Sequence, residues 1–248
     1  MLEISADILQ HTDEKTQQPF IDIICDQAGQ KGTGSWTVQN ALTLGAGSTI
    51  IAAATFARAV SSQSVHRTLA REVLGEGVPD TVSGGPDLLD NLEKAVYGAK
   101  IVAYSQGLSQ IRAACKEYGW TVDLAKLAAI WRAGCIIQAQ LLQDIMETYK
   151  DGDFDTPLLL KPAISAVIKD ALPALRAVVS DTIKAGIALP ALNAGLAYLD
   201  SLRCPALPTA LVQAQRDFFG AHTYRRRDSE GSFHTRWENP QRPEISLS

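Results

Sequence analysis

The spacing of apolar residues predicts helices along nearly the whole chain. Between Leu88 and Cys115, apolar residues recur at steps of three and four, which is the period of an amphipathic helix. Pro86 comes just before this stretch, where proline is tolerated at a first helical position. The pattern therefore predicts one long helix of roughly 30 residues, about 45 Å in length at a rise of about 1.5 Å per residue.

Further segments have the same period and are rich in the good helix formers Ala, Leu, Gln and Glu. These segments are 1–13, 36–45, 48–61, 122–132, 136–149, 160–185, 189–201 and 207–219. Two-residue alternation, which is typical of strands, is scarce. The segment 20–24 is a candidate strand, but one strand makes no sheet. The predicted fold class is all-α.

A weak internal echo suggests a repeated unit. Segment 43–50 resembles segment 183–190 when Gly45 is aligned with Gly186, since each contains a helix end, a glycine, a short turn and a second helix. Two copies of one helical unit joined by the long helix would produce this pattern. Any two helices that end at a glycine cap would produce it as well, so the pattern alone leaves both interpretations open.

The C-terminal stretch has a different character, because the helical period stops at Gly220. A polar, basic segment follows, then Phe233 and Trp237 in an irregular context, and 238–248 contains few apolar residues. We expect a helical domain over residues 1–219 and an extended tail over residues 220–248. The end of this tail is expected to fray, and its aromatic residues are expected to pack on the domain or on a partner subunit.

Composition narrows the class of protein without identifying it. The chain has 248 residues, of which 46% are hydrophobic and 20% charged, which suits one large or two small globular domains and excludes wholesale disorder. No apolar run reaches the roughly 18–20 residues that a membrane helix needs, and no export signal is recognisable. The net charge of −4 gives nucleic-acid binding no support. The short run Arg225–Arg227 is offset by Asp228 and Glu230, as in a solvated tail.

The four cysteines give no sign of a metal site. Cys25, Cys115, Cys135 and Cys204 are scattered and form no CxxC pair, so neither a structural zinc site nor a disulfide framework is expected. In the absence of an export signal, we interpret them as reduced thiols in the cytoplasm. A buried core role is favoured over a catalytic role for each.

A glycine-rich string at 28–37 is the most informative local feature. Gly29, Gly32 and Gly34 allow close approach of a ligand to the backbone, and they precede a predicted helix start, where free N–H groups favour an anion. Lys31 adds a positive charge. The string is no P-loop, because Gly34 is followed by Ser-Trp instead of Lys-Ser/Thr. The string is either a binding site for a phosphate or carboxylate group, or a plain connection between helices with a solvated lysine. The residues alone slightly favour the plain connection.

Three further residues are candidate ligand contacts. Arg58 lies in an otherwise apolar helix, where it either extends to water or grips an anion with two hydrogen bonds. Arg216 and His222 stand six residues apart across the predicted helix end at Gly220. They either meet one ligand or serve the negative end of the helix dipole. From the residues alone, the simpler role is favoured for all three.

Taken together, several strings resemble the C-terminal half of decarboxylating 6-phosphogluconate dehydrogenases. They are AGQKGTGSWT at 28–37, FARAVSS at 56–62, WRAGCIIQ at 131–138, QAQRDFFGAHTYRRRD at 213–228 and GSFHTRW at 231–237. They occur in the order and with the approximate spacing of that family, and the similarity extends from Leu2 to Trp237. The chain is identified on these strings as a member of the family.

The resemblance implies a fold, a partner and four site residues. It implies two related helical units joined by a long helix, and a homodimer in which the tail reaches into the other subunit. Lys31 and Arg58 would bind the phosphate of 6-phosphogluconate, while Arg216 and His222 of the neighbouring copy would bind its phosphate and its hydroxyl groups. The family usually has a second lysine where this chain has Ser35, from which we expect a modest effect on affinity.

The resemblance also identifies what these 248 residues do not match. The family has an NADP-binding Rossmann domain and a helix with a catalytic lysine, a substrate-binding asparagine and a catalytic glutamate, and none of these has a counterpart here. It converts 6-phosphogluconate to ribulose 5-phosphate in the pentose phosphate pathway, with NADP as oxidant and no metal. General acid–base catalysis needs its groups in place, so we expect no catalytic residue in this chain and no turnover by the chain alone.

Two functions follow from these expectations. The chain is either the substrate-binding and dimerisation part of such an enzyme, or a stand-alone module that binds a sugar phosphate or oligomerises without catalysis. Retention of Lys31, Arg58, Arg216 and His222 favours the first.

Overall fold

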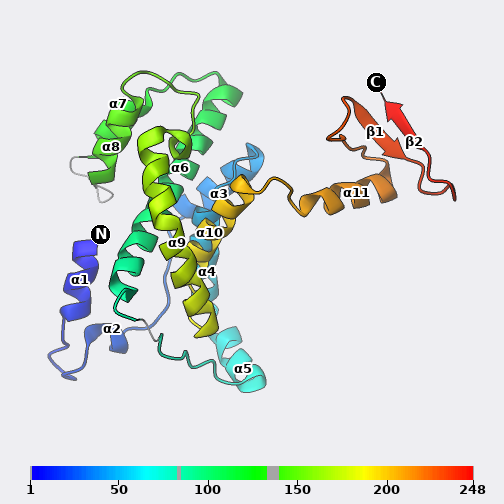
Figure 1. Ribbon diagram of the computed structural model, residues 1–248. Coiled ribbons are helices and arrows are strands. Elements are labelled where there is room, and N and C mark those ends of the chain that lie inside the picture. The colour runs from blue at the N-terminus through cyan, green and yellow to red at the C-terminus, as the bar shows by residue number, and fades with distance from the viewer. Residues whose placement is uncertain (1, 83–84, 133–139, 248) are drawn as a thin grey trace. The chain divides into compact units, whose positions relative to one another are not determined.

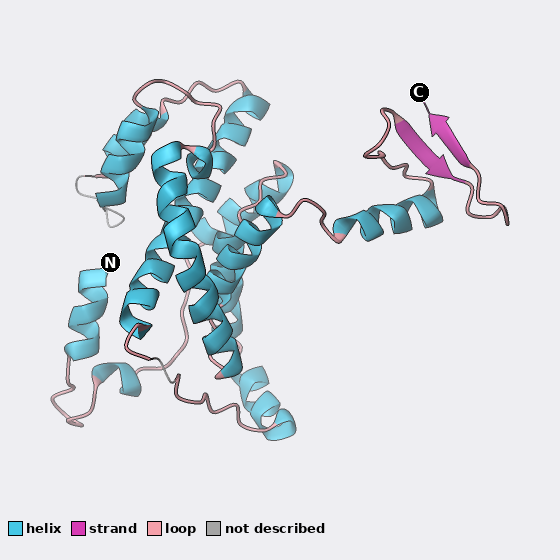
Figure 2. Cartoon of the chain, viewed as in Figure 1, coloured by secondary structure: helices cyan, strands magenta, loops and turns pink. Residues whose placement is uncertain are grey.

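The computed structural model describes residues 2–82, 85–132 and 140–247 (Figure 1). Within these ranges the elements are helices, apart from one two-stranded sheet near the C-terminus (Figure 2), which confirms the predicted all-α class. The chain divides into two compact units, Met1–Tyr198 and Leu199–Ser248. No helix in these ranges is both long and apolar enough to cross a membrane.

The first unit contains most of the helices, and α10 continues from it into the second unit. The elements are α1 (Leu2–Gln10), α2 (Phe20–Ile23), α3 (Thr33–Thr43), α4 (Thr49–Ser61), α5 (Ser64–Leu74), α6 (Leu88–Tyr118), α7 (Leu124–Ile130), α8 (Gln140–Tyr149), the short 3₁₀ helix η1 (Leu158–Leu160), α9 (Pro162–Lys184) and α10 (Pro190–Arg203). The second unit adds α11 (Thr209–Gly220), β1 (Ser232–Thr235) and β2 (Glu244–Leu247).

The predicted long helix is α6, which packs along α9 at the centre of the first unit (Figure 1). Its apolar stripe is buried, with Ile101 and Val102 fully covered. The two helices come close at Gly98, because a Cβ there would lie 2.9 Å from the Cβ of Ala171 on α9. Gly119 ends α6 in a left-handed conformation with φ 68°, as is common at helix ends.

Two buried amides on α6 hold α3 and α4, the helices that frame the glycine-rich loop. Gln106 accepts a hydrogen bond from the backbone N–H of Ile50 at 3.0 Å, so it satisfies a free donor in the first turn of α4. Gln110 accepts from the hydroxyl of Ser48 at 2.8 Å and donates to the side chain of Asn40 on α3 at 2.9 Å. Because both amides are buried, leaving them unpaired would be costly, and their bonds specify one arrangement.

The two similar segments, 43–50 and 183–190, contain the same type of turn. Gly45 follows α3 with φ 64° and Gly186 follows α9 with φ 71°. In both turns the N–H of the next residue donates to the carbonyl oxygen five residues earlier, at 2.8 Å, which is the hydrogen bond of a Schellman motif. The turns lead into α4 and α10, and these helices pack closely, since a Cβ on Gly195 of α10 would lie 3.0 Å from Ile50.

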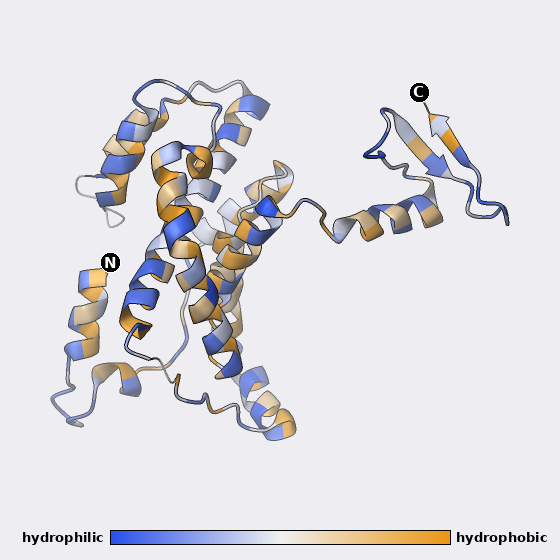
Figure 3. Ribbon diagram, in the orientation of Figure 1, coloured by the Kyte–Doolittle hydropathy of each residue, from blue (hydrophilic) through white to orange (hydrophobic). Residues whose placement is uncertain are grey.

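The structure corrects the sequence analysis in the N-terminal region. Segment 20–24, the candidate strand, contains the short helix α2. Helix α5 was not predicted, although Val65, Leu69 and Val73 recur at its period. None of its residues is buried, although Figure 3 shows hydrophobic positions along its ribbon. Of the predicted helix 136–149, only residues from Gln140 lie among the described ones, and there they form α8.

The tail is more ordered than the sequence suggested. Strands β1 and β2 pair antiparallel, with Ser232 opposite Leu247 and Thr235 opposite Glu244. The expectation that the end of the tail frays is therefore wrong for β2. Tyr224 adds an isolated bridge to Phe233, with both N–H···O distances at 2.8 Å. The tail thus folds back toward the end of α11.

Candidate functional site

The glycine-rich loop leads directly into α3. Gly32 is the residue before the helix, in a left-handed conformation with φ 97°, and no side chain caps this helix end. Uncapped N–H groups and the helix dipole make such an end suitable for an anion. Gly34 lets α3 approach α4, because a Cβ there would lie 2.9 Å from the hydroxyl oxygen of Thr55.

A pocket of about 630 Å³ opens at this helix end and contains both predicted cations. Lys31 belongs to the loop and Arg58 to α4, and both side chains are exposed. The structure thus brings together two residues that lie 27 positions apart in the sequence. The pocket is lined by Gly29, Gln30, Lys31, Thr33, Gly34, Thr55 and Arg58.

Arg58 also has a role that the sequence did not suggest. Its guanidinium donates hydrogen bonds to the backbone carbonyls of Ala28, at 3.5 Å, and of Gly29. The backbone N–H of Ala28 in turn donates to the hydroxyl of Ser61 at 2.9 Å. Arg58 therefore attaches the loop to α4, and its remaining N–H groups are left for a ligand.

An ion pair fastens the loop at its other end. Arg67 on α5 pairs with Asp26 through both carboxylate oxygens, one of them at 2.9 Å. The hydrogen bond from Arg67 holds the pKa of the Asp26 carboxyl below its ordinary value. Arg67 also donates to the carbonyl of Ser61 at 3.2 Å, so α5 contributes to the shape of the loop.

The other two predicted site residues belong to the second unit. Arg216 lies on α11 and His222 on the turn after it, and both are exposed. Arg216 donates to the side-chain oxygen of Gln213 at 3.3 Å. The His222 ring stands edge-on to Phe219, with 6.1 Å between the ring centroids, and rests against Gly220, where a Cβ would lie 2.7 Å from Nε2.

Asp217 is an organising residue that the sequence analysis missed. It is completely buried and accepts four hydrogen bonds: from the N–H groups of Thr223 at 3.0 Å and Thr235 at 3.1 Å, from His234 Nδ1 at 2.8 Å and from Trp237 Nε1 at 2.9 Å. Burial by itself would raise the pKa of this carboxyl, but the hydrogen bonds outweigh it and hold the pKa below its ordinary value. The only sequence signal was an acid between Arg216 and two phenylalanines.

Comparison with known proteins identifies the family. The family described as "6-phosphogluconate dehydrogenase, C-terminal domain" matches residues 1–237. The chain belongs to this family. The prediction from the sequence strings is therefore confirmed, although residues 133–138 of the string WRAGCIIQ lie outside the described residues.

Two relatives show how much of a family member this chain represents. The NADP(+)-dependent, decarboxylating 6-phosphogluconate dehydrogenase of Bacillus subtilis is 43% identical over 239 residues, which cover 96% of this chain and 51% of that protein. The decarboxylating 6-phosphogluconate dehydrogenase of Escherichia coli is 43% identical over 237 residues, with 96% and 50% covered. The chain spans about half the length of these relatives.

A solved structure shares the fold. The 6-phosphogluconate dehydrogenase of Plasmodium falciparum, determined in its apo form, with its cofactor NADP+ and with its substrate 6-phosphogluconate, superimposes with a TM-score of 0.88 at 40% sequence identity. The superposition covers 95% of this chain and 51% of that chain. The helical arrangement described above is therefore that of the 6-phosphogluconate dehydrogenase C-terminal domain.

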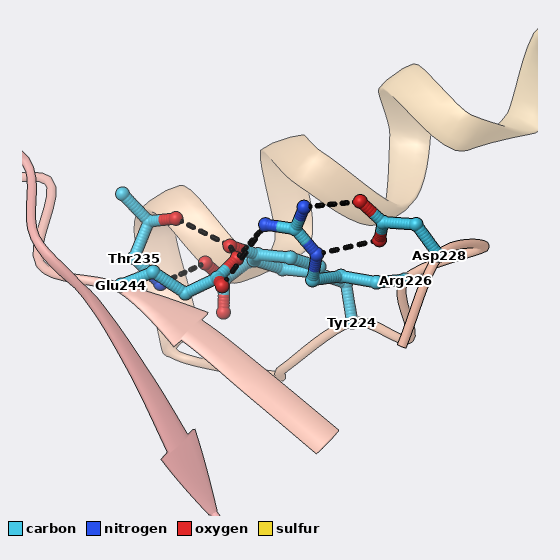
Figure 4. Close-up of polar contacts among 6 residues, drawn as sticks. Tyr224, Arg226, Asp228, Thr235 and Glu244 are labelled. Carbon is cyan, nitrogen blue, oxygen red and sulfur yellow. Dashed lines mark hydrogen bonds and ion pairs between the residues drawn. The ribbon is translucent and has the colours of Figure 1, made fainter. Parts of the chain in front are cut away.

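One arginine of the run Arg225–Arg227 in this 6-phosphogluconate dehydrogenase domain is used within the tail. Figure 4 shows the guanidinium of Arg226 between two carboxylates, with 2.6 Å to Asp228 and 3.0 Å to Glu244. The sequence had suggested Glu230 as one of the acids, but Glu244 of β2 takes that place. Tyr224 completes the cluster with hydrogen bonds of 2.7 Å to Thr235 and 2.5 Å to Glu244. The charge of Arg226 thus serves the tail.

Neither a cluster of metal-ligating side chains nor a dinucleotide fingerprint is found among the described residues. Among them, no three His, Cys, Asp or Glu side chains group as metal ligands. The glycine-rich loop joins helices α2 and α3, whereas a dinucleotide fingerprint joins a strand of a parallel sheet to a helix. The buried role expected for the cysteines is wrong for Cys25 and Cys204, which are exposed free thiols, and correct for Cys115, while Cys135 lies outside the described residues.

Proposed function

We propose that this chain is the substrate-binding and dimerisation part of an enzyme that oxidatively decarboxylates 6-phosphogluconate to ribulose 5-phosphate with reduction of NADP. The observation that carries the proposal is the pocket that holds Lys31 and Arg58 at the uncapped start of α3, in a chain of this family. A stand-alone binding module is not favoured, because the relatives over 96% of the chain are named as enzymes.

The chemistry of the pocket suits the phosphate end of the substrate. A phosphate group carries close to two negative charges and several acceptor oxygens, which a guanidinium, an ammonium group and a helix N-terminus satisfy together. In the proposed homodimer, a second copy supplies Arg216 as a further cation. It also supplies His222, whose imidazole can both donate to and accept from the hydroxyl groups of the sugar acid.

We assign the redox chemistry to a part of the enzyme other than these 248 residues. We assign the binding of NADP, which accepts the hydride in this reaction, to the part of the relatives that this chain does not span, because the glycine-rich loop lacks the strand–helix context of a dinucleotide fingerprint. The same holds for the catalytic lysine and glutamate. The role of the 248 residues is then to bind and orient 6-phosphogluconate, and we expect no NADPH production from the purified chain alone. We place the protein in the cytoplasm, in keeping with its free thiols.

Titration calorimetry with 6-phosphogluconate tests the proposal. We expect the full 248-residue chain to bind, and Lys31→Ala to weaken binding about 10-fold, because one charge-assisted hydrogen bond contributes on the order of 1.5–3 kcal/mol. The matched control is Lys169→Ala, an exposed lysine on α9, which should leave the dissociation constant unchanged. No binding by the unaltered chain, or equal weakening by the two substitutions, would contradict the proposal.

A further inference from the structure

The turn that carries His222 has an uncommon backbone. Ala221, with φ 49°, and Thr223, with φ 61°, both adopt the left-handed conformation on either side of His222. Residues with a Cβ rarely adopt it, because the Cβ crowds the following carbonyl oxygen. Such a conformation persists only when its surroundings fix it, and it is concentrated at ligand-binding sites.

Two side chains of α11 hold this turn from one side. Asp217 accepts a hydrogen bond from the N–H of Thr223 at 3.0 Å, and Gln213 donates to the carbonyl oxygen of Thr223 at 2.6 Å. Gln213 and Asp217 are four residues apart and therefore lie on the same face of the helix. Both polar backbone groups of Thr223 are thus fixed, and with them the exit of the chain from His222.

Asp217 also ties the turn to the tail. Its other three hydrogen bonds go to the backbone of Thr235 and to the side chains of His234 and Trp237. The buried position of Asp217 keeps it out of reach of any ligand, so an influence on binding must pass through the turn. Gln213 makes a second link, because it accepts a hydrogen bond from Arg216.

We propose that Asp217 and Gln213 are positioning residues that hold the turn 220–223 in the conformation in which His222 meets the substrate. The proposal rests on the proposed function, in which His222 binds the hydroxyl groups of 6-phosphogluconate. The proposal explains why a completely buried carboxylate lies next to Arg216 at the end of α11. This one group fixes the turn 220–223 and strand β1 together, and with them the position of the His222 imidazole.

A double-mutant cycle on the full chain separates positioning from stability. Asp217→Asn keeps the volume but turns an NH₂ group toward N–H donors. We expect it to weaken 6-phosphogluconate binding about as much as His222→Ala does, about 10-fold. If Asp217 acts through His222, the double variant binds no more weakly than His222→Ala alone, since residues that act together are not additive. Asp228→Asn, which removes an exposed carboxylate of the same tail, should bind like the unaltered chain.

Gln213→Ala is a milder variant that tests the proposal even if Asp217→Asn fails to fold. Gln213→Ala removes only the hydrogen bond to the Thr223 carbonyl and the one from Arg216, and we expect a smaller loss of affinity that again vanishes in the His222→Ala background. Additive effects of Asp217→Asn and His222→Ala, or of Gln213→Ala and His222→Ala, would overturn the positioning role.

Amide hydrogen exchange without ligand provides a readout that is independent of the proposed function. Exchange at the Thr223 amide should accelerate in Asp217→Asn and stay unchanged in His222→Ala and Asp228→Asn. Unchanged exchange in Asp217→Asn would overturn the proposal even if substrate binds. If the unaltered chain fails to bind 6-phosphogluconate, the proposed function and the substrate-positioning role are both wrong. Accelerated exchange in Asp217→Asn would then show that Asp217 stabilises the turn without a role in binding.

Discussion

At the scale of single residues, the position of His222 depends on a neighbour without a side chain. The ring lies over Gly220, where a Cβ would come within 2.7 Å of Nε2 and 2.8 Å of Cδ2. Real contacts are not this short, so any side chain at this position must displace the imidazole. Because the imidazole is the free end of an exposed side chain, displacing it should change the stability of the fold little. It should, however, move the imidazole out of the orientation in which it is proposed to meet the substrate.

We therefore expect Gly220→Ala to reduce binding without destabilising the fold. Gly220 is the last residue of α11, where alanine is the better helix former by at most about 1 kcal/mol. The melting temperature should stay equal or rise, while the dissociation constant for 6-phosphogluconate increases several-fold. The same substitution in a His222→Ala background should change affinity no further. Unchanged affinity of Gly220→Ala would mean that the imidazole is not held by this contact.

Tyr149 illustrates how burial alters a titrating group. Burial, with a smaller contribution from Asp153 and against an opposing one from Arg112, raises the pKa of the Tyr149 phenol from 10 to about 12. Tyr149 is 3% exposed, and its neutral phenol donates to the carbonyl of Thr156 at 3.1 Å. Its folded pKa lies above its unfolded pKa, so its contribution to stability is complete below pH 10 and is lost as the pH rises toward 12.

This shift predicts an alkaline loss of stability that one substitution removes. Between pH 10 and about 12, the free energy of unfolding should fall by roughly 2–3 kcal/mol more in the unaltered chain than in Tyr149→Phe. Urea denaturation at several pH values measures this difference. Parallel curves for the two proteins would show that Tyr149 ionises as easily in the folded chain as in the unfolded one.

Residue types could be predicted from the sequence better than residue contacts. Lys31 and Arg58 were expected to act together, and they line one pocket. The bonds of Arg58 to the loop carbonyls and the four bonds of Asp217 were not expected. Their partners lie 17–30 positions away or depend on a turn with positive φ, and no local pattern encodes either.

At the scale of elements, the contact between α6 and α9 depends on a small residue. Gly98 faces Ala171 so closely that an added Cβ would lie 2.9 Å from the alanine Cβ. Both atoms are fixed to their backbones, so a change of rotamer cannot relieve the overlap. The helices themselves would have to move apart, and the buried residues around the contact would lose packing.

Gly98→Ala should therefore destabilise the chain by about 1–2 kcal/mol, because overpacking outweighs the gain in helix propensity. Gly107 on the same helix is the matched control, since nothing lies within 4 Å of a Cβ there. Gly107→Ala should stabilise by up to about 1 kcal/mol. Chemical denaturation measures both, and equal shifts in the two variants would show that α6 and α9 tolerate separation.

Element prediction succeeded where apolar residues are periodic over several turns and buried. The long helix α6 and the helices α9 and α10 follow this rule closely. Helix α5 has an apolar period in Val65, Leu69 and Val73 but is short and has no buried residue. The strands β1 and β2 are only four residues long and pair across eight intervening residues, so alternation is too short to detect. Asp217 additionally holds β1, through His234 and Thr235.

At the scale of the whole molecule, many large apolar side chains of the described residues are exposed. On α5 no residue is buried, and Val73 and Leu74 are 79% and 85% exposed. On α11, Phe218 and Phe219 are 62% and 73% exposed. Exposed apolar patches of this kind are typical of surfaces that associate with another protein. They support the proposed homodimer.

We expect the chain to sediment as a dimer or larger species, and to associate more strongly at higher concentration. Val73→Asp with Leu74→Asp should weaken this association, because burying one large apolar side chain contributes about 1.5–3 kcal/mol. Val78→Asp is a control of similar exposure, at 77%, outside any helix. A monomer at all concentrations, or an equal effect of the control, would count against association through α5.

The bond between Asp217 and Trp237 has a practical consequence. The indole N–H donates to the same carboxylate that fixes the turn before the tail, and its ring lies 5.3 Å from that of Phe218 on α11. Indole emission responds to hydrogen bonding and to the polarity around the ring. If His222 binds the substrate as proposed, binding should change the fluorescence emission of Trp237 through Asp217 and the turn. Intrinsic tryptophan fluorescence should then follow substrate binding without an added label.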